Sequence, residues 1–140
     1  MSGDENKCPF TYNVADWVPI AGRNRQTRPL HLAFRPGNCK DCSFVTRKFD
    51  YHPLAIPAPY NHSNINSDEV IYYVAGNFMS RRGVEISSFT DPPAGLPHGT
   101  HPGTDESSIC QDATAHLPAM SDTTHPLALT RAALDPDTST

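Results

Sequence analysis

Prolines and glycines divide this chain into short apolar segments, and this division constrains its fold more than any other feature. Proline makes up 14 of the 140 residues, about twice its ordinary frequency. Proline fixes φ and lacks a backbone donor, so it interrupts both helices and inner strands. The pattern therefore favours a turn-rich β protein, or a partly disordered chain, over a helical bundle.

The segments between the turns have the composition of strands. They are rich in Val, Ile, Phe, Tyr and Thr, and they lie at residues 10–18, 30–34, 42–51, 70–75 and 84–90. Val70 to Val74 is apolar on both faces, which predicts a central strand covered on either side. No amphipathic helix is expected before residue 126, although residues 127–134 suit a short terminal helix. We therefore predict an all-β sandwich or barrel of short antiparallel strands.

The length fits one domain with a single core. Residues 1–8 read as a flexible N-terminal tail, 9–110 as the folded domain and 111–140 as a poorly defined C-terminal extension. From residue 105 onward apolar residues are few, so this part is either an irregular outer strand or disordered. The sequence alone does not decide between the two.

Composition argues against several classes of partner. The net charge is −4 with mixed signs, so neither nucleic acid nor a membrane is an expected partner. No apolar run reaches the roughly 18 residues of a membrane span, and the polar start does not suit a secretory signal, so we expect a cytoplasmic protein. Cys39 and Cys42 form a lone CxxC, which supports a zinc site weakly, and reduced thiols are the simpler reading.

Three side chains have the character of metal ligands. His62 and Glu69 are seven residues apart, roughly 23 Å in an extended chain, so they can share an ion only if the chain folds back. His98, after a Pro/Gly-rich turn, supplies a third donor. Each residue alone would be read as a surface group, and only the joint spacing favours a metal site. The segment between His62 and Glu69 has the required turn formers: Asn64, Asn66, Ser67 and Asp68.

The spacing of these residues resembles the two motifs of cupins. His62-x-Asn64, then Glu69 after four residues and Gly76 after six more, is similar to the first motif, with asparagine at the usual second histidine. Pro-x-Gly-x-x-His at residues 93–98 is similar to the second. Asp68 could replace Glu69, but only Glu69 keeps the step to Gly76. The resemblance implies a cupin-type double-stranded β-helix, or jelly roll, with short irregular termini. Two histidines and one carboxylate are also the facial triad of non-haem Fe(II) oxygenases.

Longer segments resemble the C-terminal half of homogentisate 1,2-dioxygenases. They are FDYHPLAIPAPYNHSNINSDEVIYY, GNFMSRRGVE and LPHGTHPG, which span residues 49–73, 76–85 and 96–103. The resemblance implies Fe(II) held by His62, Glu69 and His98, with His98 also against the substrate. It places a proton-accepting histidine near His31. Phe78 stands where better-known members have a substrate-contacting tyrosine, and the N-terminal half of the family chain is absent here.

The function implied is ring cleavage of homogentisate or a similar phenolic acid by dioxygen, in a homo-oligomer. Tyr60, beside the ligand turn, is a candidate for the substrate pocket. Arg81 and Arg82 suit a substrate carboxylate, but a solvated hairpin tip or a subunit contact explains them equally well. The alternative is a metal-binding cupin without turnover, acting as a structural or interaction domain. A zinc-dependent isomerase or hydrolase would favour a fuller ligand set than Asn64 allows.

Overall fold

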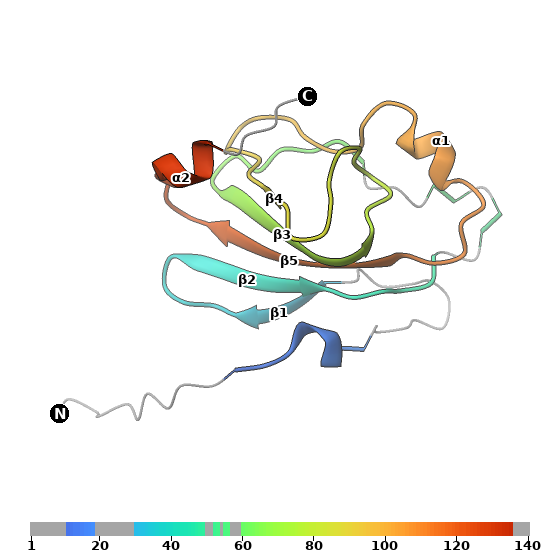
Figure 1. Cartoon of the computed structure of the whole chain (residues 1–140), viewed down its shortest axis with the longest axis horizontal. Coiled ribbons are helices and arrows are strands. Elements are labelled where there is room, and N and C mark those ends of the chain that lie inside the picture. The colour runs from blue at the N-terminus through green and yellow to red at the C-terminus, as the bar shows by residue number, and fades with distance from the viewer. Residues whose placement is uncertain (1–10, 19–29, 50–51, 54, 57–59, 136–140) are drawn as a thin grey trace.

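The fold is known from a computed structural model, which describes residues 11–18, 30–49, 52–53, 55–56 and 60–135 (Figure 1). The predicted tail, residues 1–8, lies outside the described residues. Five strands of the described part form one antiparallel sheet in the order β1-β2-β5-β3-β4. They are β1 (Leu30–Phe34), β2 (Cys39–Phe44), β3 (Asp68–Asn77), β4 (Phe89–Thr90) and β5 (Ala115–Thr123). This architecture confirms the predicted all-β class and is consistent with a cupin-like jelly roll.

Helices are few and short in the described part. They are the 3-10 turn η1 (Val14–Asp16), α1 (Thr104–Ser108) and α2 (Arg131–Leu134). α2 falls within the segment expected to form a terminal helix, and the Thr130 side chain caps it by accepting from the Ala133 N–H. Among the described residues, no helix has the length and apolar character to cross a bilayer.

β3 is an inner strand, as its apolar run predicts. It pairs with β5 on one side and with β4 on the other. Its burial alternates, however: Ile71 and Tyr73 are buried, whereas Val70 and Tyr72 are half-buried. The second face of β3 is therefore covered only in part, because it lies beside a shallow groove of about 310 Å³ that Tyr72 helps to line.

β5 overturns the expectation of an outer strand or disorder near the C-terminus. It lies between β2 and β3 and pairs with both along most of its length. Pro118, which has no N–H to donate, is tolerated there because it lies opposite Tyr73. The Tyr73 N–H donates to the Ser88 carbonyl, and the Tyr73 carbonyl accepts from the Ser87 N–H, so neither group needs Pro118 as a partner. An inner strand can thus satisfy its backbone with little apolar sequence.

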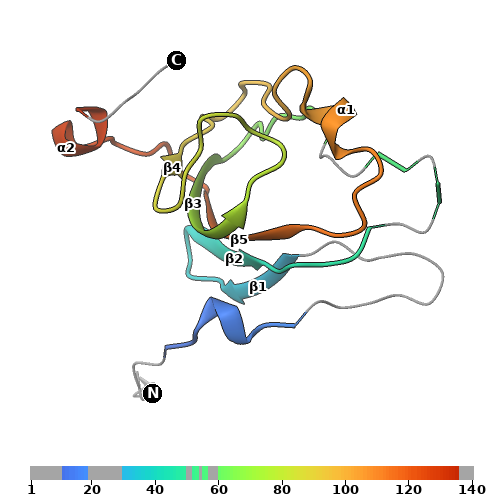
Figure 2. The ribbon, with the colours of Figure 1, turned by 45° about the vertical axis from the view of Figure 1, so that its right-hand side comes forward.

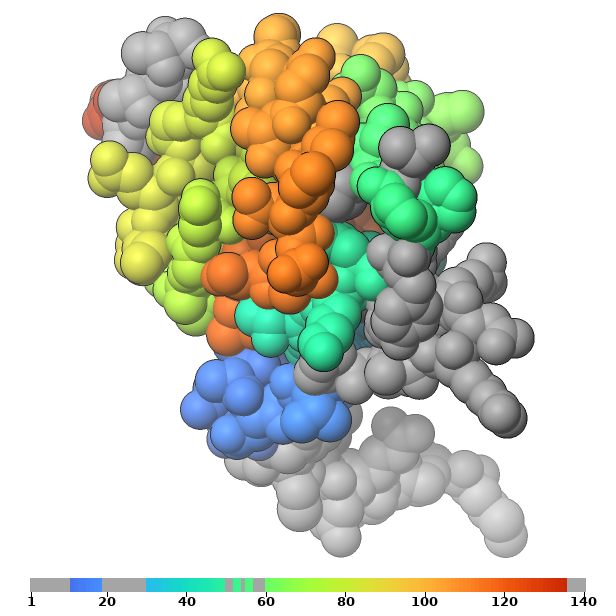
Figure 3. Space-filling view, turned by 90° about the vertical axis from the view of Figure 1, so that its right-hand side faces the viewer, coloured from blue at the N-terminus to red at the C-terminus, as the bar shows by residue number. Residues whose placement is uncertain are grey.

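The inner face of the sheet carries the core. Ile71 and Tyr73 project there, together with Cys42, Phe78 and Met120. Side chains alternate along a strand, so Glu69 projects to this same face, two positions before Ile71. In Figures 1 and 2, η1 lies beyond β1 on one side of the sheet, and the chain between β3 and β5 folds over the other. Figure 3 shows α1 and the residues after it, in orange, covering one end of the molecule.

Candidate metal centre

The two predicted motifs meet through a short backbone bridge. His62 and His98 form an isolated antiparallel pair outside the main sheet. The His62 N–H donates to the His98 carbonyl at 2.9 Å, and the His98 N–H donates back at 2.8 Å. Their rings follow, with centroids 4.5 Å apart. Backbone pairing therefore places two imidazoles side by side although they are distant in sequence.

Glu69 completes the group from the start of β3. One ligand atom from each of His62, Glu69 and His98 lies within 4.8 Å of the other two. The His98 Nε2 is 3.8 Å from the Glu69 Oε2, which is too long for a hydrogen bond. Donors held about 2.0–2.2 Å from one ion lie up to about 4.4 Å apart, so a small closure would seat a metal. The structure thus brings together all three predicted ligands.

Hydrogen bonds select the ring nitrogen that each histidine can offer. The Nδ1 of His62 lies 3.1 Å from the Tyr60 carbonyl, and the Nδ1 of His98 lies 3.0 Å from the Leu96 carbonyl. A carbonyl only accepts, so each Nδ1 carries the proton, and each neutral ring keeps a lone pair on Nε2. In the described part of the chain the buried Nε2 of His98 has no hydrogen-bond partner. A metal ion is the partner that this tautomer suits.

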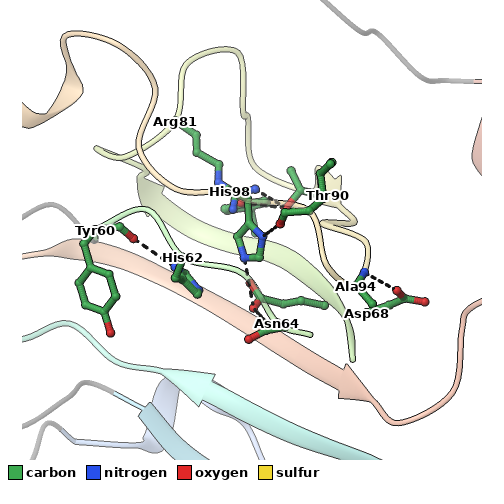
Figure 4. A network of polar contacts seen from close by, with 11 residues as sticks. Tyr60, His62, Asn64, Asp68, Arg81, Thr90, Ala94 and His98 are labelled. Carbon is green, nitrogen blue, oxygen red and sulfur yellow. Dashed lines mark hydrogen bonds and ion pairs between the residues drawn. The ribbon is translucent and has the colours of Figure 1, made fainter. Parts of the chain in front are cut away.

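The surroundings of the three ligands are unequal. Glu69 and His98 are shielded, with side chains 8% and 11% exposed, whereas His62 is exposed. A two-histidine, one-carboxylate set with one open side fits Fe(II) and leaves coordination positions free. In Figure 4, Asn64 and His98 point toward a common region while the Tyr60 ring points away from it.

Asp68 is not part of the ligand group. It precedes Glu69, so its side chain leaves the opposite face of β3. Its carboxylate accepts from the Ala94 N–H at 2.7 Å and from the Leu127 N–H at 2.6 Å. These bonds, led by that from Ala94, lower the pKa of Asp68. Asp68 therefore anchors the loop before His98 and the segment after β5, which removes it as an alternative to Glu69.

The other predicted site residues lie elsewhere or contact the group weakly. Tyr60 is exposed, and its ring centroid lies 5.7 Å from that of His62. Phe78 is buried in the core, with its ring edge-on to Tyr73 at 4.4 Å. His31 lies on β1, which β2 and β5 separate from β3, and its Nε2 is 2.9 Å from the Val18 carbonyl. The fold does not bring His31 to the ligands, so its role as proton acceptor gains no support.

Sequence reasoning missed Asp122 and did not foresee the contacts of Arg81. Asp122 on β5 lies opposite Glu69 on the neighbouring strand β3, and burial, followed by the Glu69 charge, raises the pKa of Asp122. Arg81 donates to the Thr90 hydroxyl at 3.0 Å, and the Tyr73 hydroxyl lies 3.1 Å from the same oxygen. These neighbours follow from the register of β5 and β4 against β3, and the local sequence gives no indication of that register.

The zinc site that the lone CxxC weakly suggested gains nothing from the fold. Cys39 and Cys42 are three positions apart on β2, so their side chains leave opposite faces and are poorly placed to share a zinc ion. His101, three residues after His98, accepts from the Arg82 N–H at 3.1 Å through its Nδ1.

Fold and site together define an antiparallel β domain with a candidate two-histidine, one-carboxylate metal centre. No protein-family profile matches the chain, and no solved structure matches it. A protein of Saccharolobus solfataricus named "Putative dioxygenase" is 39% identical to it over 106 residues. The match covers 76% of this chain but only 28% of that protein. The chain therefore spans a little over a quarter of the length of the relative that it matches.

Proposed function

We propose that this chain carries the metal centre of a non-haem Fe(II) dioxygenase that cleaves the ring of homogentisate or a similar phenolic acid. The observation that carries the proposal is the convergence of His62, Glu69 and His98 within 4.8 Å. The donor set suits Fe(II) oxygenases, and the similar protein from Saccharolobus solfataricus is named as a dioxygenase. A cytoplasmic location and a homo-oligomeric assembly belong to the same proposal.

The residues of the site have separate tasks in this reaction. An Fe(II) ion held here would supply the place where a phenolic acid and dioxygen meet and the path for electrons between them. His62 and His98 each present Nε2, because backbone carbonyls hold their Nδ1 protons. Glu69 would add one negative charge, which offsets part of the charge of the cation. Glu69 and His98 are shielded from solvent, which would limit the access of water on their side of the site. Substrate would therefore approach past the exposed His62. Both oxygen atoms would enter the ring-opened product, which for homogentisate is maleylacetoacetate.

Oxygen uptake is the direct test. The protein would be purified without oxygen, loaded with Fe(II) and mixed with homogentisate, beside His62→Ala and a matched control, His125→Ala, at an exposed position outside the site. We expect uptake in the wild type and the control, and none in His62→Ala. Iron bound at one per chain without uptake would refute cleavage of homogentisate by this chain and keep the metal centre. Failure to bind iron would refute both.

The rival function is a metal-binding domain without turnover. It is favoured by the exposure of His62. A site open to water on one side holds a metal readily but excludes solvent poorly from a reaction. Iron binding without oxygen uptake, with any of several phenolic acids, would favour this function.

A further inference from the structure

Asn64 stands between two of the proposed ligands and touches one of them. It is half-buried in the turn that joins His62 to β3. Its Nδ2 donates to the Glu69 Oε2 at 2.8 Å. A carboxylate oxygen can only accept, so the amide must turn its NH₂ group toward Glu69. That nitrogen has no lone pair to offer a metal, and the same bond turns the amide oxygen, which could bind one, away from the Glu69 carboxylate.

The oxygen that Asn64 binds is the one that faces His98. The Glu69 Oε2 is also the atom 3.8 Å from the His98 Nε2. The backbone of Asn64 is tied to the same region, because its carbonyl accepts from the Gly95 N–H at 2.7 Å, three residues before His98. The side chain and the main chain of Asn64 thus link Glu69 to the loop that carries His98.

A free glutamate side chain has several rotamers, and selecting one costs conformational entropy when a ligand binds. The bond from Asn64 selects the rotamer of Glu69 before any ion arrives. Hydrogen bonds of this kind to a ligating carboxylate commonly change metal affinity by roughly ten- to a hundredfold.

We propose that Asn64 is a positioning residue that holds the Glu69 carboxylate toward the two histidines and itself stays outside the ligand set. Asparagine at this position of the turn has two effects that a histidine there would not combine. It orients the carboxylate, and it leaves a coordination position open for substrate or dioxygen. The inference rests on the proposed metal centre and concerns how its ligands are held.

Binding of Co(II) alone tests the role without relying on turnover. Competition titration would give the affinity and the number of ions per chain, and the visible absorption of Co(II) reports its coordination number. The variants are Asn64→Ala, Asn64→His and a matched control, Asn66→Ala, at an exposed position of the same turn. Thermal unfolding of each metal-free protein separates a loss of fold from a loss of binding. If Asn64→Ala does not fold, Asn64→Leu keeps the side-chain volume and still lacks the donor.

We expect Asn64→Ala to bind one Co(II) per chain roughly ten- to a hundredfold more weakly than the wild type. Its metal-free unfolding should stay close to that of Asn66→Ala, whose affinity should be unchanged. In Asn64→His the imidazole should fill the open coordination position. The Co(II) spectrum should then change toward a higher coordination number, and added azide, which would bind at that open position, should bind more weakly.

Two results would overturn the inference, and they differ in what they leave standing. If Asn64→Ala binds Co(II) as tightly as the wild type, the metal centre stands and the role of Asn64 is wrong. If the wild type binds no Co(II) or Fe(II), the metal centre itself is wrong, and the bond to Glu69 only shapes the turn.

Discussion

Replacement of Phe78 by leucine should destabilise the protein by about 2 kcal/mol without changing metal affinity. Phe78 is 7% exposed, so the lost apolar area, roughly 40 Å² at about 25 cal/mol per Å², costs about 1 kcal/mol. Its edge-on contact with the Tyr73 ring at 4.4 Å adds about 0.5–1.5 kcal/mol. For a chain of this length we expect the melting temperature to fall by about 6–8 °C.

The assay is thermal and urea unfolding of the metal-free protein, followed by metal titration. Phe89→Leu is the matched control, because Phe89 also packs on a tyrosine ring, that of Tyr72 at 4.6 Å, but is 67% exposed. It should cost under about 1 kcal/mol. The reasoning fails if Phe78→Leu is as stable as Phe89→Leu. A loss of substrate affinity at unchanged stability would instead support the substrate contact expected from the sequence.

Three further results are expected. Co(II) at a hundred times its dissociation constant should stabilise the protein by about 2.7 kcal/mol, as seen in thermal unfolding, and Glu69→Gln should abolish this gain. Burial lowers the pKa of His116 from its ordinary value of 6.5. The neutral, buried His116 stabilises the fold above about pH 6.5, and this stabilisation is lost as the pH falls through the lowered pKa. The melting temperature of His116→Gln should therefore change less between about pH 8 and pH 5 than that of the wild type. Asp68→Ala should weaken hydrogen-exchange protection of the Ala94 and Leu127 amides, and unchanged protection would show that Asp68 does not hold these segments.

The parts of the fold that sequence predicted are those with a strong local pattern. Val70 to Val74 combines β-branched and aromatic residues without interruption, and it forms the inner strand β3. The inner position of β5 was not predicted, because Pro118 and several polar residues weaken the strand pattern of its sequence. Its place depends on which strands it pairs with, and pairing between distant segments leaves little trace in the sequence of either one.

In the candidate site, too, the residues set by local spacing could be predicted and those set by the fold could not. His62, Glu69 and His98 could be selected from spacing, and the structure gathers them. The position of His31 relative to these residues could not be read from the sequence, because it is set by the two strands that lie between β1 and β3. The bond from Asn64 to Glu69 also went unforeseen, although the resemblance to the first cupin motif had singled out Asn64.

Local hydrogen bonds explain why the candidate ligands were easier to select from sequence than substrate contacts. The Nδ1–H of His62 and that of His98 each donate to the carbonyl two residues earlier, at Tyr60 and at Leu96. Each motif therefore sets the tautomer and the direction of its own imidazole, and Asn64 sets the direction of the Glu69 carboxylate within one turn. A substrate surface has no such local basis, because it is assembled from strand register and from whatever chain covers the exposed side of His62. If this account is right, His62→Gln should lose the metal while its backbone bridge to His98 persists, and hydrogen exchange at the two bridging amides would measure that.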